Sequence, residues 1–149
     1  MSYLNQFDES GWPVVYARFE GPASIEGYDD FANRLATVTA DAVKRKRRFV
    51  CVLDARGKIE ISADVRRHIA AWTAKQQKVD VALGSIVIFD STILRGVITA
   101  ISWVSREQMT SVSTAADGEQ AWRIACEVLQ AAGLQAPQRP AWALARSGT

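Results

Sequence analysis

A chain of 149 residues has the length of one globular domain, with room for a substantial buried core. Hydrophobic residues make up 48% of it and charged residues 23%, which are ordinary proportions for a soluble domain. The formal net charge is only +2, which argues against a dedicated nucleic-acid-binding protein, because such domains usually carry a clear basic excess.

The N-terminal part of the chain predicts a hairpin followed by a helix. Residues 4–7 and 14–19 have the composition of strands, and the small polar residues 8–11 between them suit a hairpin loop. Gly21 and Pro22 are expected to end the second strand, after which Ser24 can cap a helix. The apolar face of that helix recurs at steps of three and four residues: Tyr28, Phe31, Leu35, Val38 and Ala42.

The middle of the chain predicts a buried strand and a second helix. The short apolar run 49–53 suits a strand that is covered on both faces, and residues 54–57 are expected to end it. Ser62 is expected to open a helix with one apolar side formed by Val65, Ile69 and Trp72. The segment 78–84 is interpreted as a loop.

The last part of the chain predicts two more strands and two more helices. Residues 85–89 read as a central strand, and a helix is expected from Ser91 or Thr92 to about Val104. A short strand is expected at 109–112, and Thr114 is expected to cap a last helix. The apolar stripe of that last helix is Trp122, Ala125 and Leu129, with Gly133 placed to end it.

The predicted order is a β-hairpin followed by alternating helices and strands, which is typical of an α/β fold. We expect a mixed four- to five-stranded sheet with helices, in a single domain over residues 1–133. Residues 134–149 contain Pro137 and Pro140 and show no periodicity, so they are expected to form a flexible tail or one that docks through Trp142.

Polar residues follow two of the predicted strands and form the main candidate site. Right-handed crossovers between parallel strands would bring the segments after residues 53 and 89 to the same edge of the sheet. Arg56 could bind an anion there, and two carboxylates could hold Mg²⁺, but strand-ending turns explain the same residues equally well. The residues expected near one another are Asp54, Arg56, Asp90, Ser91 and Arg95.

Four short segments carry a family resemblance: Phe19-Glu20-Gly21, Tyr28-Asp29-Asp30-Phe31, Val52-Leu53-Asp54 and Phe89-Asp90-Ser91. With the opening hairpin, they make the chain resemble the STAS-like, anti-sigma-factor-antagonist-like proteins, a STAS/SEC14-like group found in many bacteria. The resemblance covers about residues 1–133 and implies a STAS-like fold. It also raises a partner-switching role, because anti-sigma antagonists carry a phosphorylatable serine after an aspartate at a strand-to-helix turn.

Ser91 is the candidate phosphorylation site that this resemblance implies. Asp90-Ser91-Thr92 matches the opening of the family motif, but Ile93 and Leu94 stand where that motif has its glycine. A phosphate at a helix N-terminus is stabilised by free amide groups and by the helix dipole. The alternative is that the same turn only caps the helix.

The helix predicted after Ser91 is apolar on two sides. One side suits the core, and a second apolar face is formed by Ile93, Gly96, Ala100 and Trp103. A helix with one buried side should carry polar residues on the other. We therefore expect this second face to be covered, either by another part of the chain or by a protein partner, which could be a second copy in a homodimer.

Other reactive residues predict no catalytic set, metal site or cofactor site. His68 is the single histidine; Asp64 stands one helical turn before it, and no nucleophile motif accompanies the pair. Cys51 and Cys126 lie in apolar patterns without a CxxC spacing, so they are expected to be free buried thiols.

The remaining charge and hydropathy patterns bear on location and partners. The N-terminal residues 1–11 have no basic segment followed by an apolar run, and the apolar stretch 85–104 is interrupted by Asp90 and Arg95. We therefore expect a cytoplasmic protein without a membrane-spanning segment. The basic run 44–48 suits the solvated end of a helix or an acidic partner, and the absence of aromatic residues within it makes nucleic acid an unlikely partner.

These patterns favour a non-catalytic regulatory or protein-interaction module of STAS-like fold that associates with itself. The alternative is a small ligand-binding protein or enzyme that uses the polar edge at Asp54, Arg56, Asp90, Ser91 and Arg95. The first is favoured because the acids and bases form no recognisable catalytic arrangement.

Overall fold

A computed structural model describes residues 3–75, 81–89 and 112–144. Its elements in chain order are β1 (Leu4–Asp8), β2 (Val14–Pro22), α1 (Ile25–Arg45), β3 (Phe49–Glu60), α2 (Ala63–Lys75), β4 (Ala82–Ile88), β5 (Val112–Ala115), α4 (Gly118–Ala131) and the 3₁₀ helix η1 (Ala141–Leu144). The predicted α/β class, with an N-terminal hairpin followed by alternating helices and strands, is confirmed.

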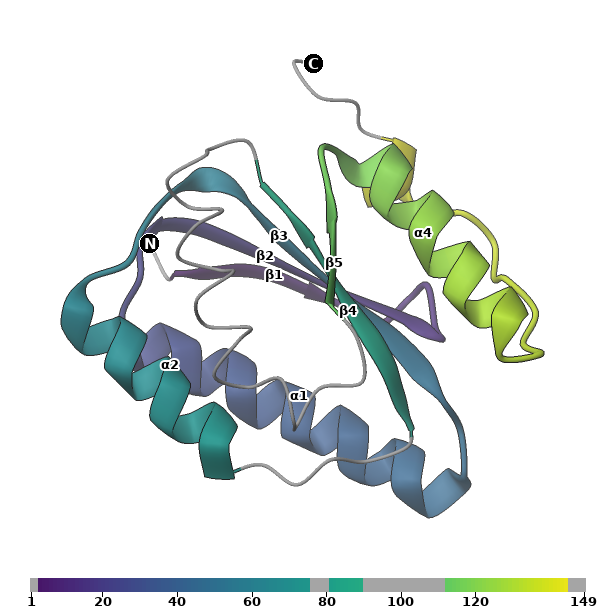
Figure 1. The fold of residues 1–149 in the computed structure, drawn as a ribbon, viewed down its shortest axis with the longest axis horizontal. Helices are drawn as coiled ribbons and strands as arrows, with labels where there is room; N and C mark the ends of the chain where they lie inside the picture. The colour runs from purple at the N-terminus through teal and green to yellow at the C-terminus, as the bar shows by residue number, and fades with distance from the viewer. Residues whose placement is uncertain (1–2, 76–80, 90–111, 145–149) are drawn as a thin grey trace.

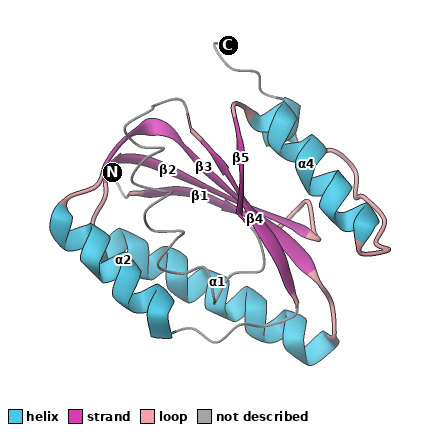
Figure 2. Ribbon diagram, in the orientation of Figure 1, coloured by secondary structure: helices cyan, strands magenta, loops and turns pink. Residues whose placement is uncertain are grey.

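The described strands form one mixed sheet of five strands in the order β1-β2-β3-β4-β5 (Figure 1). β1 is antiparallel to β2, and the three other neighbouring pairs are parallel. The strand order follows the chain order, so each crossover advances in the same direction across the sheet. Crossovers of one hand then place α1 and α2 on the same face. Figure 2 shows these two helices on one side of the sheet and α4 on the other.

Each face of the sheet is covered by its own hydrophobic core. Alternate residues of a strand point to opposite faces, so Val50 and Val52 of β3 pack on the α4 side, whereas Phe49 and Cys51 pack toward α1. The predicted apolar stripe of α4 lies in the first core, where Leu129 and Ala125 are fully buried. The sequence-based expectation that this strand is covered on both faces is therefore confirmed.

Helix α1 begins and ends as its sequence dictates. The Ser24 hydroxyl accepts a hydrogen bond from the Gly27 amide at 3.0 Å, which confirms the predicted cap. Lys46 ends the helix in the left-handed conformation, with φ 55°. The predicted apolar face is buried at Tyr28, Phe31, Val38 and Ala42, and Leu35 is partly buried.

β3 is longer than predicted, because residues 54–57 do not end it. The strand continues to Glu60, and β2 also continues, through Gly21, as far as Pro22. β2 and β3 remain paired in this stretch, where the register between them shifts twice. Gly57 makes the close approach feasible, since a β-carbon there would lie 2.5 Å from the carbonyl oxygen of Phe19.

Three other boundaries also differ from the predictions. β4 begins at Ala82, inside the segment interpreted as a loop. β5 extends to Ala115, so Thr114 lies in a strand and does not cap the last helix. Asp117 caps it instead, and its carboxylate accepts a hydrogen bond from the Gln120 amide at 2.8 Å.

The C-terminal segment returns alongside α4 (Figure 1) and packs on the core through Trp142 and Ala143. Trp142 is 8% exposed, and its ring stacks on that of Tyr16 with centroids 4.6 Å apart. It also meets the edge of Trp122 at 5.8 Å. Of the two expectations for the tail, docking through Trp142 is therefore the one that the described residues show.

Candidate functional site

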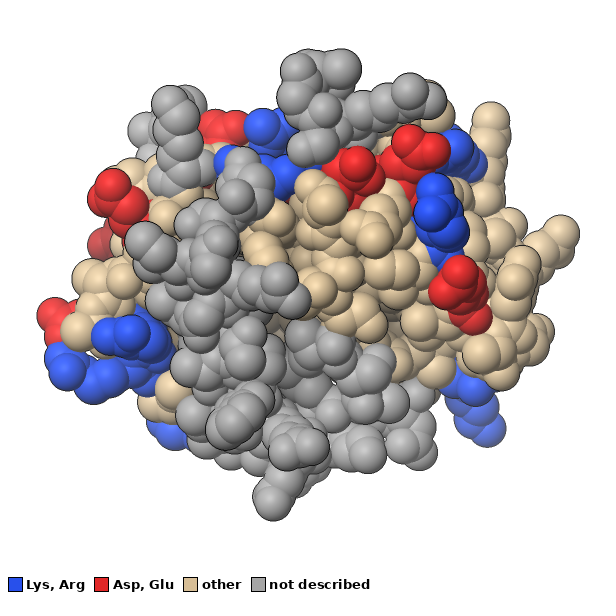
Figure 3. Space-filling view, turned by 45° about the horizontal axis from the view of Figure 1, so that its top comes forward, with Lys and Arg blue, Asp and Glu red and all other residues tan. Residues whose placement is uncertain are grey.

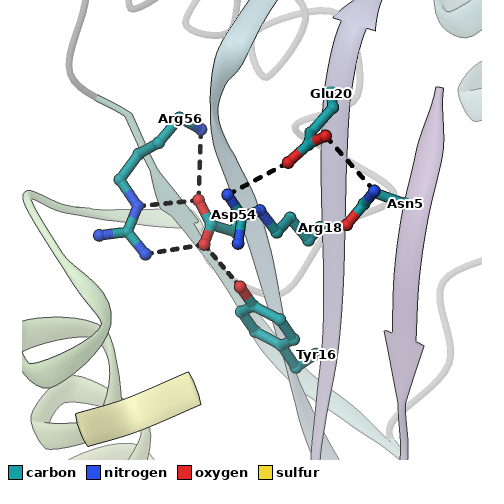
Figure 4. A network of polar contacts seen from close by, with 6 residues as sticks. All are labelled: Asn5, Tyr16, Arg18, Glu20, Asp54 and Arg56. Atoms are coloured by element: carbon teal, nitrogen blue, oxygen red, sulfur yellow. Dashed lines mark hydrogen bonds and ion pairs between the residues drawn. The ribbon is translucent and has the colours of Figure 1, made fainter. Parts of the chain in front are cut away.

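The predicted polar edge centres on two charged residues of β3. Asp54 and Arg56 lie two positions apart on the strand, so their side chains are on the same face of the sheet. Tyr16 of the neighbouring strand β2 lies on that face as well, because Arg18, two positions after it, is the register partner of Asp54. Figure 4 shows the three side chains converging above the sheet.

The carboxylate of Asp54 accepts four hydrogen bonds. One oxygen, Oδ1, accepts from the backbone amide of Arg56 at 3.2 Å and from its Nε at 2.9 Å. The other, Oδ2, accepts from the hydroxyl of Tyr16 at 2.6 Å and from Nη2 of Arg56 at 2.8 Å. A carboxylate has about four acceptor positions, so these contacts use them all.

The environment of Asp54 stabilises its charged form. Its side chain is 1% exposed, and this burial by itself would raise the pKa of the carboxyl group. The hydrogen bonds from Arg56 and Tyr16, together with the positive charge of Arg56, outweigh burial and hold the pKa of Asp54 below its usual value. The same partnership raises the pKa of Arg56. Asp54 is therefore a paired anion at neutral pH.

Tyr16 completes the network and ties it to the core. Its hydroxyl is a donor to Asp54 and its ring is covered by Trp142. Burial, followed by the hydrogen bond to Asp54, raises the pKa of Tyr16 far above its usual value. Tyr16 therefore stays protonated and holds the carboxylate in place.

A second polar cluster lies beside this network, toward the β1 edge of the sheet (Figure 4). Arg18 forms an ion pair with Glu20 at 3.2 Å, and the side-chain amide of Asn5 donates to the other Glu20 oxygen at 3.4 Å. The Arg18 side chain is 44% exposed. Exposed pairs of this kind add little stability, so this cluster reads as a solvated part of the sheet face.

The structure brings together only part of the predicted set. Asp54 and Arg56 are in direct contact, and Ile88, the last residue of β4, is the register partner of Asp54 in the parallel β3–β4 pair. Two groups of predicted residues lie outside the described residues: the edge residues Asp90, Ser91 and Arg95, and the interface residues Ile93, Gly96, Ala100 and Trp103.

Two members of the site were missed from the sequence. Tyr16 lies 38 positions before Asp54, and Trp142 is in the tail. The alternation of β2 marks Tyr16 as facing one side of the sheet, but no local pattern reveals that its partner is an acid on the next strand. For the tail, the one indication in the sequence that it packs on the domain was Trp142, an isolated aromatic residue in a segment without periodicity.

The histidine has a different partner from the one suggested by its helix. His68 Nε2 lies 2.7 Å from a carboxylate oxygen of Asp29 in α1, whereas Asp64 pairs with Arg67. The imidazole also meets the ring edge of Tyr28. The contact links α2 to α1, and a helix-to-helix contact could not be read from spacing within one helix.

The two cysteines are free thiols, as expected. Cys51 is buried in β3, and burial raises its pKa to about 12. The expectation of a buried thiol is wrong for Cys126, which is only partly buried; burial raises its pKa as well. Neither has the lowered pKa that activates a nucleophilic cysteine.

Metal and membrane features can be assessed for the part of the chain that the structure describes. Within it, no group of three or more His, Cys, Asp or Glu side chains is placed to hold a metal ion. No helix there is long and apolar enough to cross a membrane. On the face in Figure 3, acidic and basic side chains of the described residues are interspersed.

Comparisons with known proteins identify no relative. No protein-family model, no curated protein and no solved structure matches the chain.

Proposed function

We propose that this protein is a non-catalytic regulatory or protein-interaction module of STAS-like fold that associates with itself. The observation that carries the non-catalytic part is the saturation of Asp54 by Tyr16 and Arg56. A general base or a metal ligand needs a lone pair that is free to meet a proton or a cation. The lone pairs of the Asp54 carboxylate are already occupied by hydrogen bonds from Tyr16 and Arg56.

The arrangement of the sheet supports the STAS-like part of the proposal. An N-terminal hairpin is followed by parallel strands whose order along the sheet matches their order along the chain. This is the kind of α/β fold that the resemblance of residues 1–133 implies. Fold alone does not specify function, so the role must be tested at its proposed surfaces.

Self-association rests on the sequence pattern of Ile93, Gly96, Ala100 and Trp103. Apolar residues on a second helix face need a cover, and a second copy of the chain or another protein would supply it. A cytoplasmic location likewise remains an expectation from the sequence.

Multi-angle light scattering of the full chain tests self-association. We expect the wild type to have the mass of a dimer or larger assembly, and Trp103→Arg to have the mass of a monomer because a buried charge opposes association. Val43→Arg is the matched control, since Val43 is 50% exposed in α1 and its replacement should leave the mass unchanged. Circular dichroism verifies that the variants are folded. A monomeric wild type would remove self-association from the proposal.

Ser91 remains the candidate switch. If it is a phosphorylation site, Ser91→Asp should change self-association or partner binding in the same light-scattering assay. If it only caps a helix, Ser91→Asp should leave the assembly unchanged, since Asp is also a good cap.

The alternative function is a small ligand-binding protein or enzyme that uses Asp54, Arg56, Asp90, Ser91 and Arg95. A thermal-shift screen with nucleotides, phosphates, lipids and Mg²⁺ tests it. Stabilisation that disappears in the Arg95→Gln variant would favour this alternative, because Arg95 belongs to the polar edge predicted from the sequence. No stabilisation by any of these compounds would favour the interaction module.

A further inference from the structure

A hollow in the surface is lined by three consecutive basic residues and by two segments that are distant from them in the sequence. Lys46, Arg47 and Arg48, at the end of α1, line a hollow of about 280 Å³. Its other walls are Trp12 and Pro13 of the hairpin and residues 134–135 of the C-terminal segment. We call this hollow the basic groove. The sequence contains no aromatic residue within the basic run, but the fold supplies Trp12 beside it.

The walls of the basic groove are joined by direct contacts. The Arg48 guanidinium donates to the carbonyl of Ala132 at 2.7 Å, which links α1 to the end of α4. The Pro13 carbonyl accepts from the Val50 amide at 2.9 Å, which ties the hairpin to β3. The Trp12 ring stacks on Phe49 with centroids 5.6 Å apart. These contacts fix the groove without using the side chains of its other two cations.

Lys46, Arg47 and Arg48 have no acidic partner among the described residues. By contrast, Arg45, the residue just before them, forms an ion pair with Asp41 at 3.0 Å. The side chains lining the groove include no Asp or Glu. The positive charge of the groove is therefore not neutralised by the described side chains.

The helix ends beside the groove do not cancel this charge. The last carbonyls of α1 accept hydrogen bonds from the Lys46 and Arg47 amides, and those of α4 from the Gly133 and Leu134 amides. Each helix C-terminus is equivalent to roughly half a negative charge. Three cations beside two such ends leave a net charge of about +2, which matches a phosphate dianion.

We propose that the basic groove binds the phosphate group of a small phosphorylated organic molecule. Arginine and lysine are the side chains that proteins use for phosphate, through charge-assisted hydrogen bonds. Trp12 and Leu134 offer an apolar wall to the organic part of the ligand. The volume lies near the lower end of the roughly 300–1,000 Å³ typical of ligand pockets, so the ligand is small.

Nuclear magnetic resonance of the full chain tests this site, with phenyl phosphate and inorganic phosphate as probes at constant ionic strength. We expect saturable shifts of the Trp12 indole signal and of the Arg47 amide, with phenyl phosphate bound more tightly than phosphate alone. Lys46→Gln/Arg47→Gln should weaken phenyl phosphate binding by at least about tenfold, because two charge-assisted contacts are lost. Arg48 is left intact because it holds the groove together.

Arg66→Gln/Lys75→Gln is the matched control. Both residues are exposed on α2, outside the groove, and their loss changes the net charge by the same amount. We expect this control to bind phenyl phosphate as the wild type does. Equal weakening in the two double variants would overturn the proposal, as would shifts that never saturate. A response to polyglutamate without one to either phosphate would assign the groove to an acidic protein segment instead. None of these outcomes bears on self-association, which is measured separately.

Discussion

The polar network of Tyr16, Asp54 and Arg56 and the basic groove use charged side chains in opposite ways. In the network, a carboxylate that is 1% exposed has every acceptor position filled by its neighbours. In the groove, Lys46 and Arg47 are exposed and have no described acidic partner. Pairing and burial, more than residue type, therefore separate a charged side chain that stabilises the fold from one that is open to a ligand.

The largest effect is expected when the buried partner charge is removed. Arg56→Met leaves the Asp54 carboxylate buried without its counter-charge and with two of its four hydrogen bonds lost. Breaking a buried ion pair costs about 3–5 kcal/mol, and we expect about 3 kcal/mol here because the Arg56 side chain is 19% exposed. Urea unfolding, monitored by circular dichroism, measures this loss in the free energy of unfolding.

Arg18→Met is the matched control for that variant. Arg18 is on the adjacent strand and also pairs with an acid, but its side chain is 44% exposed. Its loss should lower the free energy of unfolding by less than about 1 kcal/mol. Equal losses in the two variants would contradict the distinction between the buried network and the solvated cluster.

A smaller effect is expected when only the hydroxyl of the network is removed. Tyr16→Phe keeps the ring stacked on Trp142 but deletes the 2.6 Å hydrogen bond to Asp54. Hydrogen bonds to charged groups contribute roughly 1.5–3 kcal/mol, so the free energy of unfolding should fall by about 2 kcal/mol. An unchanged value would mean that the hydroxyl does not hold the carboxylate.

The network should also make the free energy of unfolding depend on pH. The pKa of Asp54 is lowered in the folded state, so its contribution is fully present above its unfolded pKa of about 3.9 and is lost as the pH falls through the folded value. At neutral pH, the free energy of unfolding of the wild type should therefore be larger than that of the Asp54→Asn variant. This difference between the two proteins should shrink below about pH 4. Chemical unfolding at a series of pH values measures it. A difference that stays constant into acid would contradict the lowered pKa.

The smallest effect on stability is expected at the basic groove. Lys46→Gln/Arg47→Gln removes no described ion pair, so the free energy of unfolding should change by less than about 0.5 kcal/mol, as for ordinary surface substitutions. Thermal denaturation of this variant beside the wild type measures it. A loss as large as that of Arg56→Met would show that the groove residues are structural.

Periodicity in the sequence was enough to predict the fold class. The stripe from Tyr28 to Ala42 marked α1, and the run 49–53 marked a strand buried on both faces. Strand ends were less predictable. Residues 54–57 look like a turn, and they stay in β3 because β2 continues beside them through a shifted register that Gly57 accommodates. Such pairing between strands leaves no local signal.

The candidate site was predicted only in part for the same reason. Parallel strands correctly placed Asp54 beside the end of β4, but its contacts with Tyr16 and its cover by Trp142 depend on tertiary packing. Likewise, Trp12 reaches the basic run only because the hairpin packs against β3. The sequence shows which residue types are present, whereas the contacts between residues distant in the sequence become visible only in the folded structure.

The most direct test of the central claim, that Asp54 is committed to its internal partners, is carbon-13 nuclear magnetic resonance of its carboxyl group over the pH range in which the protein stays folded. We predict a titration midpoint below the ordinary value of about 3.9, and a signal that does not move when Mg²⁺ or phosphate is added at neutral pH. A midpoint at or above the ordinary value, or a saturable shift with either addition, would contradict the account.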